Sequence, residues 1–378
     1  MKIKKIKFQD LYTQYKSIKK EIDLAIKNTI KHSSFVRGSD VDLFEKEFAK
    51  SLGLDHCISC GNGTDALYIG MKALNLNKND EVIVPAVSWI STSESVTQAG
   101  GKVVFCDVLR KNLTINPRLI EEKITKKTVG IIPVHLYGHP ANMSELVKIA
   151  KKYKLWIIED CAQAHYAKIH NKFVGTFGNL STFSFYPGKN LGAMGDAGSI
   201  LTNNKDLATK MYRFARHGGL FKGEHEIEGM NSRLDGIQAA ILRVKLKYIA
   251  GWTKKRQDIA SLYSDLLKNI EEISLPDVEK GCEHVWHLYV IKVKTDREML
   301  IEFLKKRGIE TNVNYPTSLP FLNAYKRYKS KKRDFPVAFE SQSQILSLPI
   351  YPEMRLNEVR YISSEIKDYF KNQARKNI

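Results

Sequence analysis

Apolar and polar residues alternate along the chain with two different periods. A stripe of apolar residues that recur every three or four positions predicts an amphipathic helix near the start; it comprises Leu11, Tyr15, Ile18, Ile22 and Ile26. The predicted strands that follow are 56–60, 81–84, 102–106, 128–134 and 155–158, and the predicted helices are 41–49, 64–74, 90–98, 117–124 and 143–152. This rhythm predicts βαβ crossovers and a mostly parallel sheet with helices on both faces.

The pattern changes after residue 233. Two long helical patterns, 233–248 and about 252–270, lead into a region that mixes short strands and helices. Its strand, 286–293, alternates polar and apolar residues, as a half-exposed strand should. A chain of 378 residues usually divides into two domains. We therefore expect a large α/β domain over 1–248, N-terminal helices included, and a smaller α+β domain over 249–378.

Polar residues follow two of the predicted strands at the point where each strand ends. Asp160 comes directly after the apolar strand 155–158, and a second strand, 180–185, carries Ser184 and leads into a Pro-Gly turn with Lys189. In open α/β sheets, ligands lie outside the carboxyl ends of the strands. We therefore expect Asp160, Ser184 and Lys189 to face a ligand.

This combination suits pyridoxal 5'-phosphate (PLP). The chemistry needs an amine that condenses with the aldehyde and later moves protons, and a buried carboxylate that keeps the pyridine nitrogen protonated. Lys189 and Asp160 would fill these roles. Taken alone, two such residues are more often a turn cap and a solvated surface lysine, so it is the flanking sequence that favours the cofactor.

The flanking motifs are specific and extend over nearly the whole chain. They include CGNGTDAL at 60–67, EDCAQAH at 159–165, FSFYPGKN at 183–190, GDAGSI at 195–200 and GMNSRLDGIQAAIL at 229–242. In these motifs the chain resembles the DegT-type sugar-nucleotide aminotransferases, which are fold-type I PLP enzymes. The resemblance implies a mostly parallel seven-stranded sheet between helices and a homodimer with shared active sites.

A glycine-rich turn separates the strand 56–60 from the helix 64–74. In that position backbone N–H groups can converge on an anion at the start of a helix. Such a turn is by itself more often plain turn chemistry. Together with Asp160 and Lys189 it acquires a function, because PLP needs a phosphate anchor. We assign Gly63 and Thr64 to the phosphate, with the hydroxyl of Ser184 as a second donor, and the family has its phosphate contacts at the matching positions.

Three further residues are candidates for contacts with the ring. Trp89 follows the strand 81–84, so a flat indole at the sheet edge could stack on the pyridine, although an ordinary core tryptophan would give the same pattern. The resemblance implies a stacking aromatic at this position. Gln163 is placed to bond the phenolic oxygen of the ring. His165 is either a satisfied loop histidine or, as the resemblance implies, a catalytic group beside the substrate or Lys189.

Asn231 has two interpretations. The resemblance implies that it crosses the dimer interface to the partner's phosphate, whereas the sequence alone is equally consistent with a cap on a helix that begins near Arg233.

The chain departs from the family pattern after Tyr315. Many members have a proline and a histidine soon after this Tyr-Pro pair, whereas this chain continues with 317–320, Thr-Ser-Leu-Pro. Substrate contacts are therefore not assigned there.

Charge and cysteines exclude several other classes of protein. The net charge of +19 is consistent with a nucleic acid, an acidic membrane surface, an anionic substrate or a lysine-rich surface and does not choose among them. The densest basic cluster, 326–333, lacks the pattern of a nucleic-acid module. Five cysteines, an odd number, indicate a reducing compartment. Neither the Cys57–Cys60 pair nor the His135–His139 pair has the setting of a metal site, so no metal is expected. No apolar stretch is long enough to span a bilayer, and we expect a cytoplasmic protein without a membrane or nucleic-acid partner.

The expected function is PLP-dependent amination of a nucleotide-linked keto sugar, with L-glutamate as donor. The amino-acid sequence of the 159–198 motifs is most similar to that of the aminotransferases that act on C3 of dTDP-3-keto-6-deoxyhexoses. Those enzymes serve surface polysaccharide (lipopolysaccharide O-antigen, lipooligosaccharide or S-layer glycan). A C4 aminotransferase acting on a dTDP-, UDP- or GDP-4-keto sugar is the alternative. PLP sugar dehydratases share the fold but lack the lysine, and a DNA-binding regulator would need no electron sink.

Overall fold

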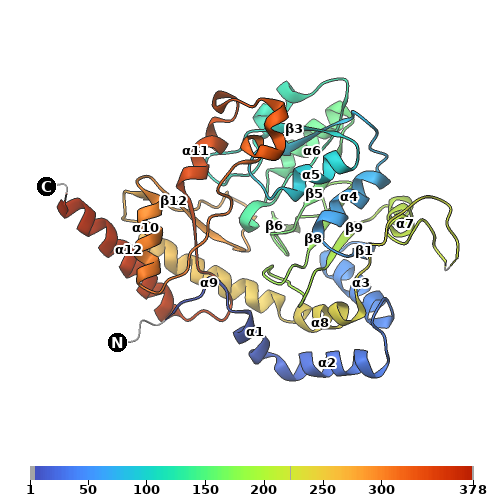
Figure 1. The fold of residues 1–378 in the computed structure, drawn as a ribbon, viewed down its shortest axis with the longest axis horizontal. Helices are drawn as coiled ribbons and strands as arrows, with labels where there is room; N and C mark the ends of the chain where they lie inside the picture. The colour runs from blue at the N-terminus through green and yellow to red at the C-terminus, as the bar shows by residue number, and fades with distance from the viewer. Residues whose placement is uncertain (1–4, 222, 377–378) are drawn as a thin grey trace.

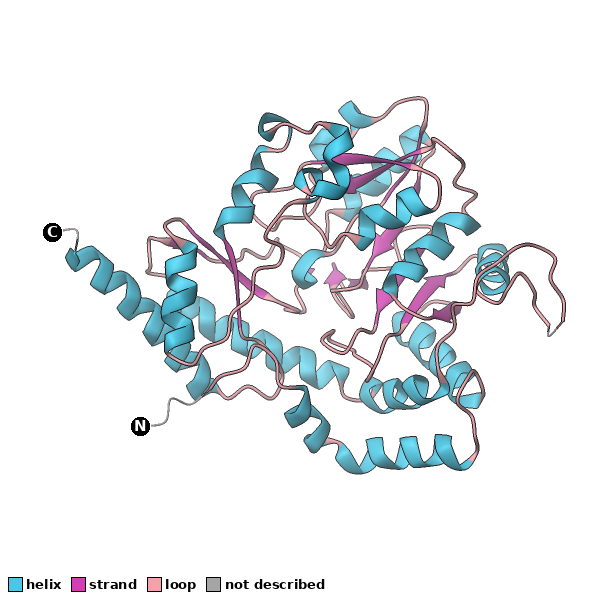
Figure 2. Ribbon diagram, in the orientation of Figure 1, coloured by secondary structure: helices cyan, strands magenta, loops and turns pink. Residues whose placement is uncertain are grey.

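A seven-stranded sheet forms the centre of the large domain in the computed structural model, which describes residues 5–221 and 223–376 (Figures 1 and 2). Its strand order is β1-β9-β8-β5-β4-β2-β3. The strands are β1 (His56–Cys60), β2 (Glu81–Pro85), β3 (Lys102–Cys106), β4 (Thr128–Ile131), β5 (Trp156–Asp160), β8 (Leu180–Ser184) and β9 (Gly198–Thr202). The strand β9 is antiparallel to both of its neighbours, β1 and β8, and the other neighbouring pairs in this sheet are parallel. The α/β class with a mostly parallel sheet is confirmed.

Helices cover both faces of the sheet because successive strand residues point to opposite sides. In β2, Val82 and Val84 belong to one buried cluster and Ile83 to the other. The first cluster lies under α4 (Gly63–Ala73), α5 (Ser91–Gln98) and α7 (Lys205–Phe214), and the second lies under α3 (Ser39–Leu52), α6 (Met143–Tyr153) and α8 (Gly236–Leu246). The carboxyl ends of the parallel strands therefore lie along one edge of the sheet, which is where ligands bind in open α/β sheets.

Two of the predicted helices are wrong in their extent. The N-terminal stripe forms two helices, α1 (Leu11–Ser17) and α2 (Lys19–Lys31), because Ile18 leaves helical geometry with φ −125°. The predicted helix 117–124 is a pair of 3-10 turns, η1 (Pro117–Leu119) and η2 (Glu121–Lys123). Neither difference alters the sheet.

The C-terminal region has a sheet of its own in the order β10-β12-β13 (left in Figure 1). Its strands are β10 (Ile273–Ser274), β12 (Tyr289–Val293) and β13 (Ile345–Leu348), and its helices are α9 (Ile249–Leu267), α10 (Arg297–Lys306), α11 (Pro336–Gln344) and α12 (Leu356–Lys376). The predicted strand 286–293 begins later, at Tyr289, because Arg256 takes the carbonyls of Trp286 and His287.

Short elements complete the described chain. A third small sheet joins β6 (Lys168–Ile169), β7 (Lys172–Phe173) and β11 (Cys282–Glu283). The remaining 3-10 turns are η3 (Leu136–Gly138), η4 (Leu319–Phe321), η5 (Asn323–Tyr328) and η6 (Lys332–Asp334). Among the described residues, no helix combines the length and the apolar character that crossing a membrane requires.

The two ends of the chain exchange contacts across the predicted domain division. Ile6 pairs with Ile309 and is buried in the cluster formed by α9, β12 and α12. In the other direction, Tyr325 and Phe335 pack edge-on against Phe105 of β3. The segment that holds η4 to η6 therefore covers the large domain, although it lies late in the chain.

Candidate active site

Lys189 lies at the end of a tight turn, as the Pro-Gly pair predicts. Its backbone N–H donates to the carbonyl of Tyr186 at 2.8 Å, which closes the turn. Two side chains hold this loop from outside: the amide of Gln9 donates to the Gly188 carbonyl at 2.9 Å, and the ammonium of Lys245 donates to the Gly192 carbonyl at 2.7 Å. Burial lowers the pKa of Lys189 to about 8, while the charge of Asp160 opposes the shift. The amine is thus poised for chemistry near neutral pH.

Asp160 is buried at the end of β5 and is held on both oxygens. The hydroxyl of Thr92 donates to Oδ2 at 3.0 Å, and the backbone N–H of Ala162 donates to Oδ1 at 3.1 Å. Burial raises the pKa of Asp160 above its usual value, although these two hydrogen bonds and the charge of Lys189 oppose the shift. The sequence did not indicate Thr92, which lies 68 residues earlier, in helix α5.

Gly63, Thr64 and Ser184 come together where α4 begins. Asn62 caps this helix, because its side chain accepts from the N–H of Asp65. A Cβ on Gly63 would lie 2.7 Å from the Cβ of Ser184, so the glycine leaves room that any other residue would fill. The hydroxyl of Thr64 bonds that of Ser91 at 2.6 Å. Free N–H groups at a helix start and nearby hydroxyls fit a phosphate.

Gln163 is held with its amide in one orientation. Its Oε1 accepts from the backbone N–H of Tyr137 at 2.6 Å, so Nε2 is the group that donates to the hydroxyl of Tyr315 at 2.9 Å. The ring of Tyr315 lies 5.3 Å from that of Trp89, which is 56% exposed. The structure therefore adds Tyr137 and Tyr315 to the site, two residues to which the sequence analysis gave no role.

His165 lies beneath the site and not at its surface. The imidazole is fully buried, with ring centroids 5.4 Å from Phe183 and 5.7 Å from Phe185. Burial, with a smaller contribution from the Lys189 charge, lowers the pKa of His165 to about 3. The ring is therefore neutral at any working pH, and the nearby charge of Lys189 helps to keep it so.

Asn231 is exposed on the single chain, at an isolated bridge with Arg216. The interpretation of Asn231 as a helix cap is wrong. The helix α8 begins only at Gly236, and its N-cap residue is Asp235. The neighbouring Ser232 accepts from the N–H of Gly61 at 2.9 Å and donates to Asp65 at 2.6 Å, which fixes this segment against the start of α4.

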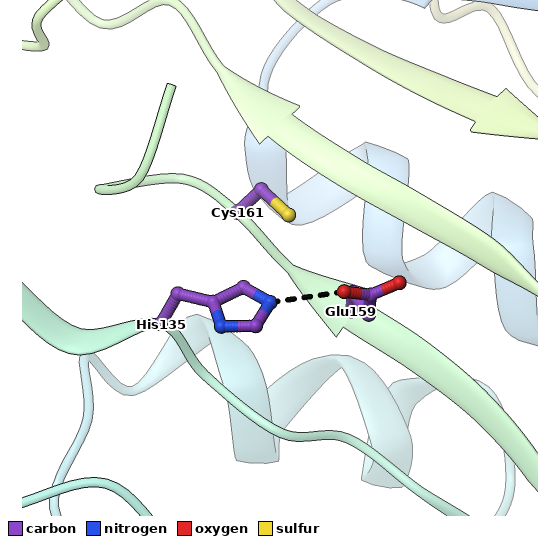
Figure 3. A group of neighbouring side chains, drawn as sticks. All are labelled: His135, Glu159 and Cys161. Carbon is purple, nitrogen blue, oxygen red and sulfur yellow. Dashed lines mark hydrogen bonds and ion pairs between the residues drawn. The ribbon is translucent and has the colours of Figure 1, made fainter. Parts of the chain in front are cut away.

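A second polar cluster lies behind the site and joins His135, Glu159 and Cys161 (Figure 3). Its ligand atoms are close enough for a metal, but Glu159 already accepts from His135 and from the N–H groups of Gly175, Phe177 and Gly178, at 2.6–3.1 Å. Nδ1 of His135 accepts from the N–H of Ala141, so the ring proton is on Nε2. The carboxylate is satisfied internally, as in a structural hydrogen-bond network.

These groups fit PLP. Lys189 and Asp160 lie on the same sheet edge as the Gly63–Ser184 cradle, which supplies donors for a phosphate. When bound, PLP supplies an aldehyde that condenses with amines and a ring that withdraws electrons.

Residues 16–367 match the profile of the DegT/DnrJ/EryC1/StrS aminotransferase family. The chain belongs to this family. It is 39% identical over 364 residues to the dTDP-3-amino-3,6-dideoxy-alpha-D-galactopyranose transaminase of Aneurinibacillus thermoaerophilus, covering 96% of this chain and 99% of the relative. It is 36% identical over 361 residues to the UDP-2-acetamido-2-deoxy-3-oxo-D-glucuronate aminotransferase of Pseudomonas aeruginosa, covering 96% and 99%.

A solved structure of similar shape is that of DesV from S. venezuelae in complex with a ketimine intermediate. It superimposes with a TM-score of 0.94 at 35% identity and covers 97% of this chain and 98% of DesV. The chain is accordingly a PLP-dependent sugar-nucleotide aminotransferase, as the sequence motifs predicted.

Proposed function

We propose that this aminotransferase transfers the amino group of L-glutamate to C3 of a dTDP-linked 3-keto-6-deoxyhexose. The observation that carries the proposal is the end-to-end similarity to the Aneurinibacillus transaminase, whose name describes a dTDP-linked 3-amino-3,6-dideoxyhexose. The Pseudomonas relative also acts at a 3-oxo carbon, but on a UDP-linked sugar. Position C3 is therefore better supported than the nucleotide.

In this proposal each side chain has one task. Lys189 receives and returns the proton that moves during amino transfer, since its amine is half-deprotonated near pH 8. Asp160 stabilises positive charge on the pyridine nitrogen, and the Gly63–Thr64–Ser184 cradle binds the phosphate. Trp89 and Gln163 orient the ring. His165 packs beneath Lys189 as a neutral imidazole, because burial and the Lys189 charge both disfavour its protonated form.

We propose a homodimer in which Asn231 reaches the partner's phosphate. Support comes from its exposure on the single chain and from the fixed position of its neighbour Ser232 beside Gly61. We place the reaction in the cytoplasm and assign its product to surface polysaccharide. The five cysteines are all free thiols, which suits a reducing compartment.

A panel of substrates tests the function. The PLP-loaded enzyme is incubated with glutamate and with dTDP-3-keto, dTDP-4-keto, UDP-3-keto, UDP-4-keto and GDP-4-keto sugars, and the amino sugar is followed by mass. The proposal expects the dTDP-3-keto sugar to have the highest kcat/KM. Preference for a 4-keto isomer would replace it with the C4 alternative, and preference for the UDP-3-keto sugar would change the nucleotide alone.

A further inference from the structure

A cavity of about 410 Å³ lies between the large domain and the C-terminal sheet. One wall is the loop after β3, which carries Arg110 and Lys111, and the opposite wall is one face of β12. The volume is within the range of small-molecule sites in proteins, about 300–1,000 Å³. None of Lys189, Asp160, Ser184 and Gly63 lines it, and Tyr137 is the one residue of the candidate active site that does, so the two are neighbouring but distinct.

The floor of the cavity is apolar. It is formed by Leu113, Leu136, Leu288 and Val290, all of them buried. Two imidazoles extend the floor: His139 and His284 lie edge to face, with centroids 5.5 Å apart. Burial lowers the pKa of both rings, so they carry no charge and offer aromatic surface.

The rim is cationic. Four of its six charged side chains are basic, and two of these form ion pairs across the cavity mouth: Arg110 with Glu340, and Lys111 with Asp277 at 3.3 Å. Lys292 in β12 and Lys294, the residue after this strand ends, remain and both line the cavity; within the described ranges neither forms an ion pair with a carboxylate.

Each of these two lysines keeps donors for a ligand. Lys292 donates to the carbonyl of Arg110, and Lys294 donates to that of Glu271 at 2.6 Å. An ammonium has three N–H donors, so these bonds leave up to two on each lysine. The chain stays paired with the segment at β10 up to Lys294, whose backbone N–H donates to the carbonyl of Glu272 at 2.8 Å. Extended residues two apart are separated by about 7 Å, and both lysines line the cavity, so one anionic group can be approached by both. Burial, and next the charge of Arg110, lower the pKa of Lys292, which means that its charged form is destabilised. An anion beside the ammonium would stabilise that form.

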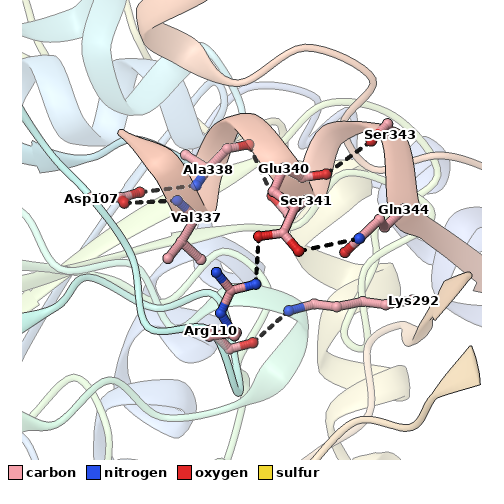
Figure 4. A network of polar contacts seen from close by, with 9 residues as sticks. All are labelled: Asp107, Arg110, Lys292, Val337, Ala338, Glu340, Ser341, Ser343 and Gln344. Atoms are coloured by element: carbon pink, nitrogen blue, oxygen red, sulfur yellow. Dashed lines mark hydrogen bonds and ion pairs between the residues drawn. The ribbon is translucent and has the colours of Figure 1, made fainter. Parts of the chain in front are cut away.

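Hydrogen bonds and an ion pair join the loop after β3 to α11, which both contribute to the cavity walls (Figure 4). Asp107 accepts from the backbone N–H groups of Val337 and Ala338 at 3.0 and 2.9 Å, which ties the loop after β3 to the start of α11. The Arg110–Glu340 pair joins the same two elements one helical turn later. Preorganised walls lower the entropic cost of binding.

We propose that this cavity is a second ligand site, for a small planar organic anion with one phosphate or carboxylate group. The ring lies on the apolar floor against His139 and His284, and the anionic group lies between Lys292 and Lys294. Tyr137 separates the two sites, since its side chain lines the cavity while its backbone N–H holds Gln163.

The test uses the PLP-loaded enzyme with dTDP present in excess, so that the cofactor and nucleotide regions of the active site are filled. Two probes, 1-naphthyl phosphate and 1-naphthoate, are titrated separately by calorimetry up to millimolar concentration. We expect at least one probe to bind at one equivalent per chain, and the stronger of the two identifies the preferred anionic group.

Three variants decide where the probe binds. Lys292→Gln with Lys294→Gln should weaken binding at least about tenfold, because two charge-assisted bonds are lost. Ser274→Trp places a large ring at an exposed position opposite Lys292 and should abolish binding. Lys148→Gln with Lys151→Gln removes the same charge from the exposed face of α6 and should change binding less than twofold. No binding of either probe to the parent enzyme, or equal binding to the parent and the Lys292/Lys294 variant with its fold intact, would overturn the proposal.

Discussion

A Cβ on Gly63 would lie 2.7 Å from the Cβ of Ser184, so the first residue of α4 and the last residue of β8 are in direct contact. Two carbon atoms that are not bonded to each other do not approach so closely. A rotation of the Ser184 side chain would not remove the clash, because its Cβ stays in place and the backbone Cα would also be only 3.3 Å from the added atom. The phosphate cradle therefore depends on the absence of a side chain at position 63.

Gly63→Ala should reduce PLP affinity about tenfold or more, since overpacking of this kind typically costs about 1–3 kcal/mol. Fluorescence titration of the apoenzyme with PLP measures the change. Gly251→Ala is the matched control, because an added Cβ in α9 meets no atom within 4 Å. The control should keep its PLP affinity and gain up to about 1 kcal/mol of stability from better helix propensity. An unchanged affinity in Gly63→Ala would remove this cradle from the phosphate site.

Replacement of the two central residues separates binding from chemistry. Lys189→Ala should abolish amino transfer, because the proton carrier is gone. Asp160→Asn keeps the shape of the side chain and should still bind PLP, but turnover should fall on the order of 10²-fold or more without the charge beside the pyridine nitrogen. Product formation from glutamate and the keto sugar measures both. Wild-type turnover in either variant would contradict these roles.

The roles of Asp160, Ser184, Gly63 and Thr64 toward the cofactor stay predictions that rest on the flanking motifs. The strand-end rule accounts for their meeting at one edge of the sheet, since parallel strands bring their carboxyl ends to one edge whatever their order. It could not find Tyr137. That residue acts through its backbone N–H, a group that every residue except proline offers. Nor could spacing reveal Tyr315, which bonds Gln163 across 152 residues.

Element types were predicted better than their ends. The helical stripe from Leu11 to Ile26 continues through Ile18, and only the packing of Ile18 and Ile22 against α8 decides that the chain bends there. The later start of β12 has a similar cause, since the carbonyls of residues 286 and 287 bond the buried Arg256. Both boundaries depend on tertiary contacts that no local pattern contains.

The reactivity of Lys189 should rise through pH 8 instead of through the ordinary lysine range near 10.5. Only the neutral amine attacks an aldehyde, so the rate at which the apoenzyme recombines with PLP should increase with pH and level off above the pKa of about 8. Stopped-flow absorbance across pH 6–11 measures it. Because the Asp160 charge raises this pKa, Asp160→Asn should move the midpoint to lower pH. A midpoint near 10.5 would show that burial does not control the amine.

Glu159 should be essential to the fold. Each of its oxygens accepts two hydrogen bonds, from Phe177 and Gly178 on one side and from Gly175 and His135 on the other. In Glu159→Gln an amide N–H₂ would face two donors, which should lower the free energy of unfolding by about 3 kcal/mol or more. Urea denaturation at fixed PLP measures it. Glu121→Gln, which breaks an exposed pair with Lys152, should cost less than about 1 kcal/mol.

If Asn231 reaches the partner's phosphate, each active site takes Lys189 from one chain and Asn231 from the other. Asn231→Asp should weaken cofactor binding, because a carboxylate then opposes a phosphate at a cost of at least ~1 kcal/mol. Lys189→Ala removes the amine, so both homodimers should be impaired. In a mixed dimer one site collects both defects and the other has neither.

Activity should therefore rise well above that of either parent when the two variants are unfolded together and reassociated. Mass spectrometry of the intact dimers confirms that chains have exchanged. The matched control mixes Lys189→Ala with Asp160→Asn, two defects that lie in the same chain's site in every arrangement. That mixture should stay near the average of its parents, because each site of the mixed dimer keeps one of the two defects. If the Asn231→Asp mixture behaves as this control does, Asn231 acts within its own chain.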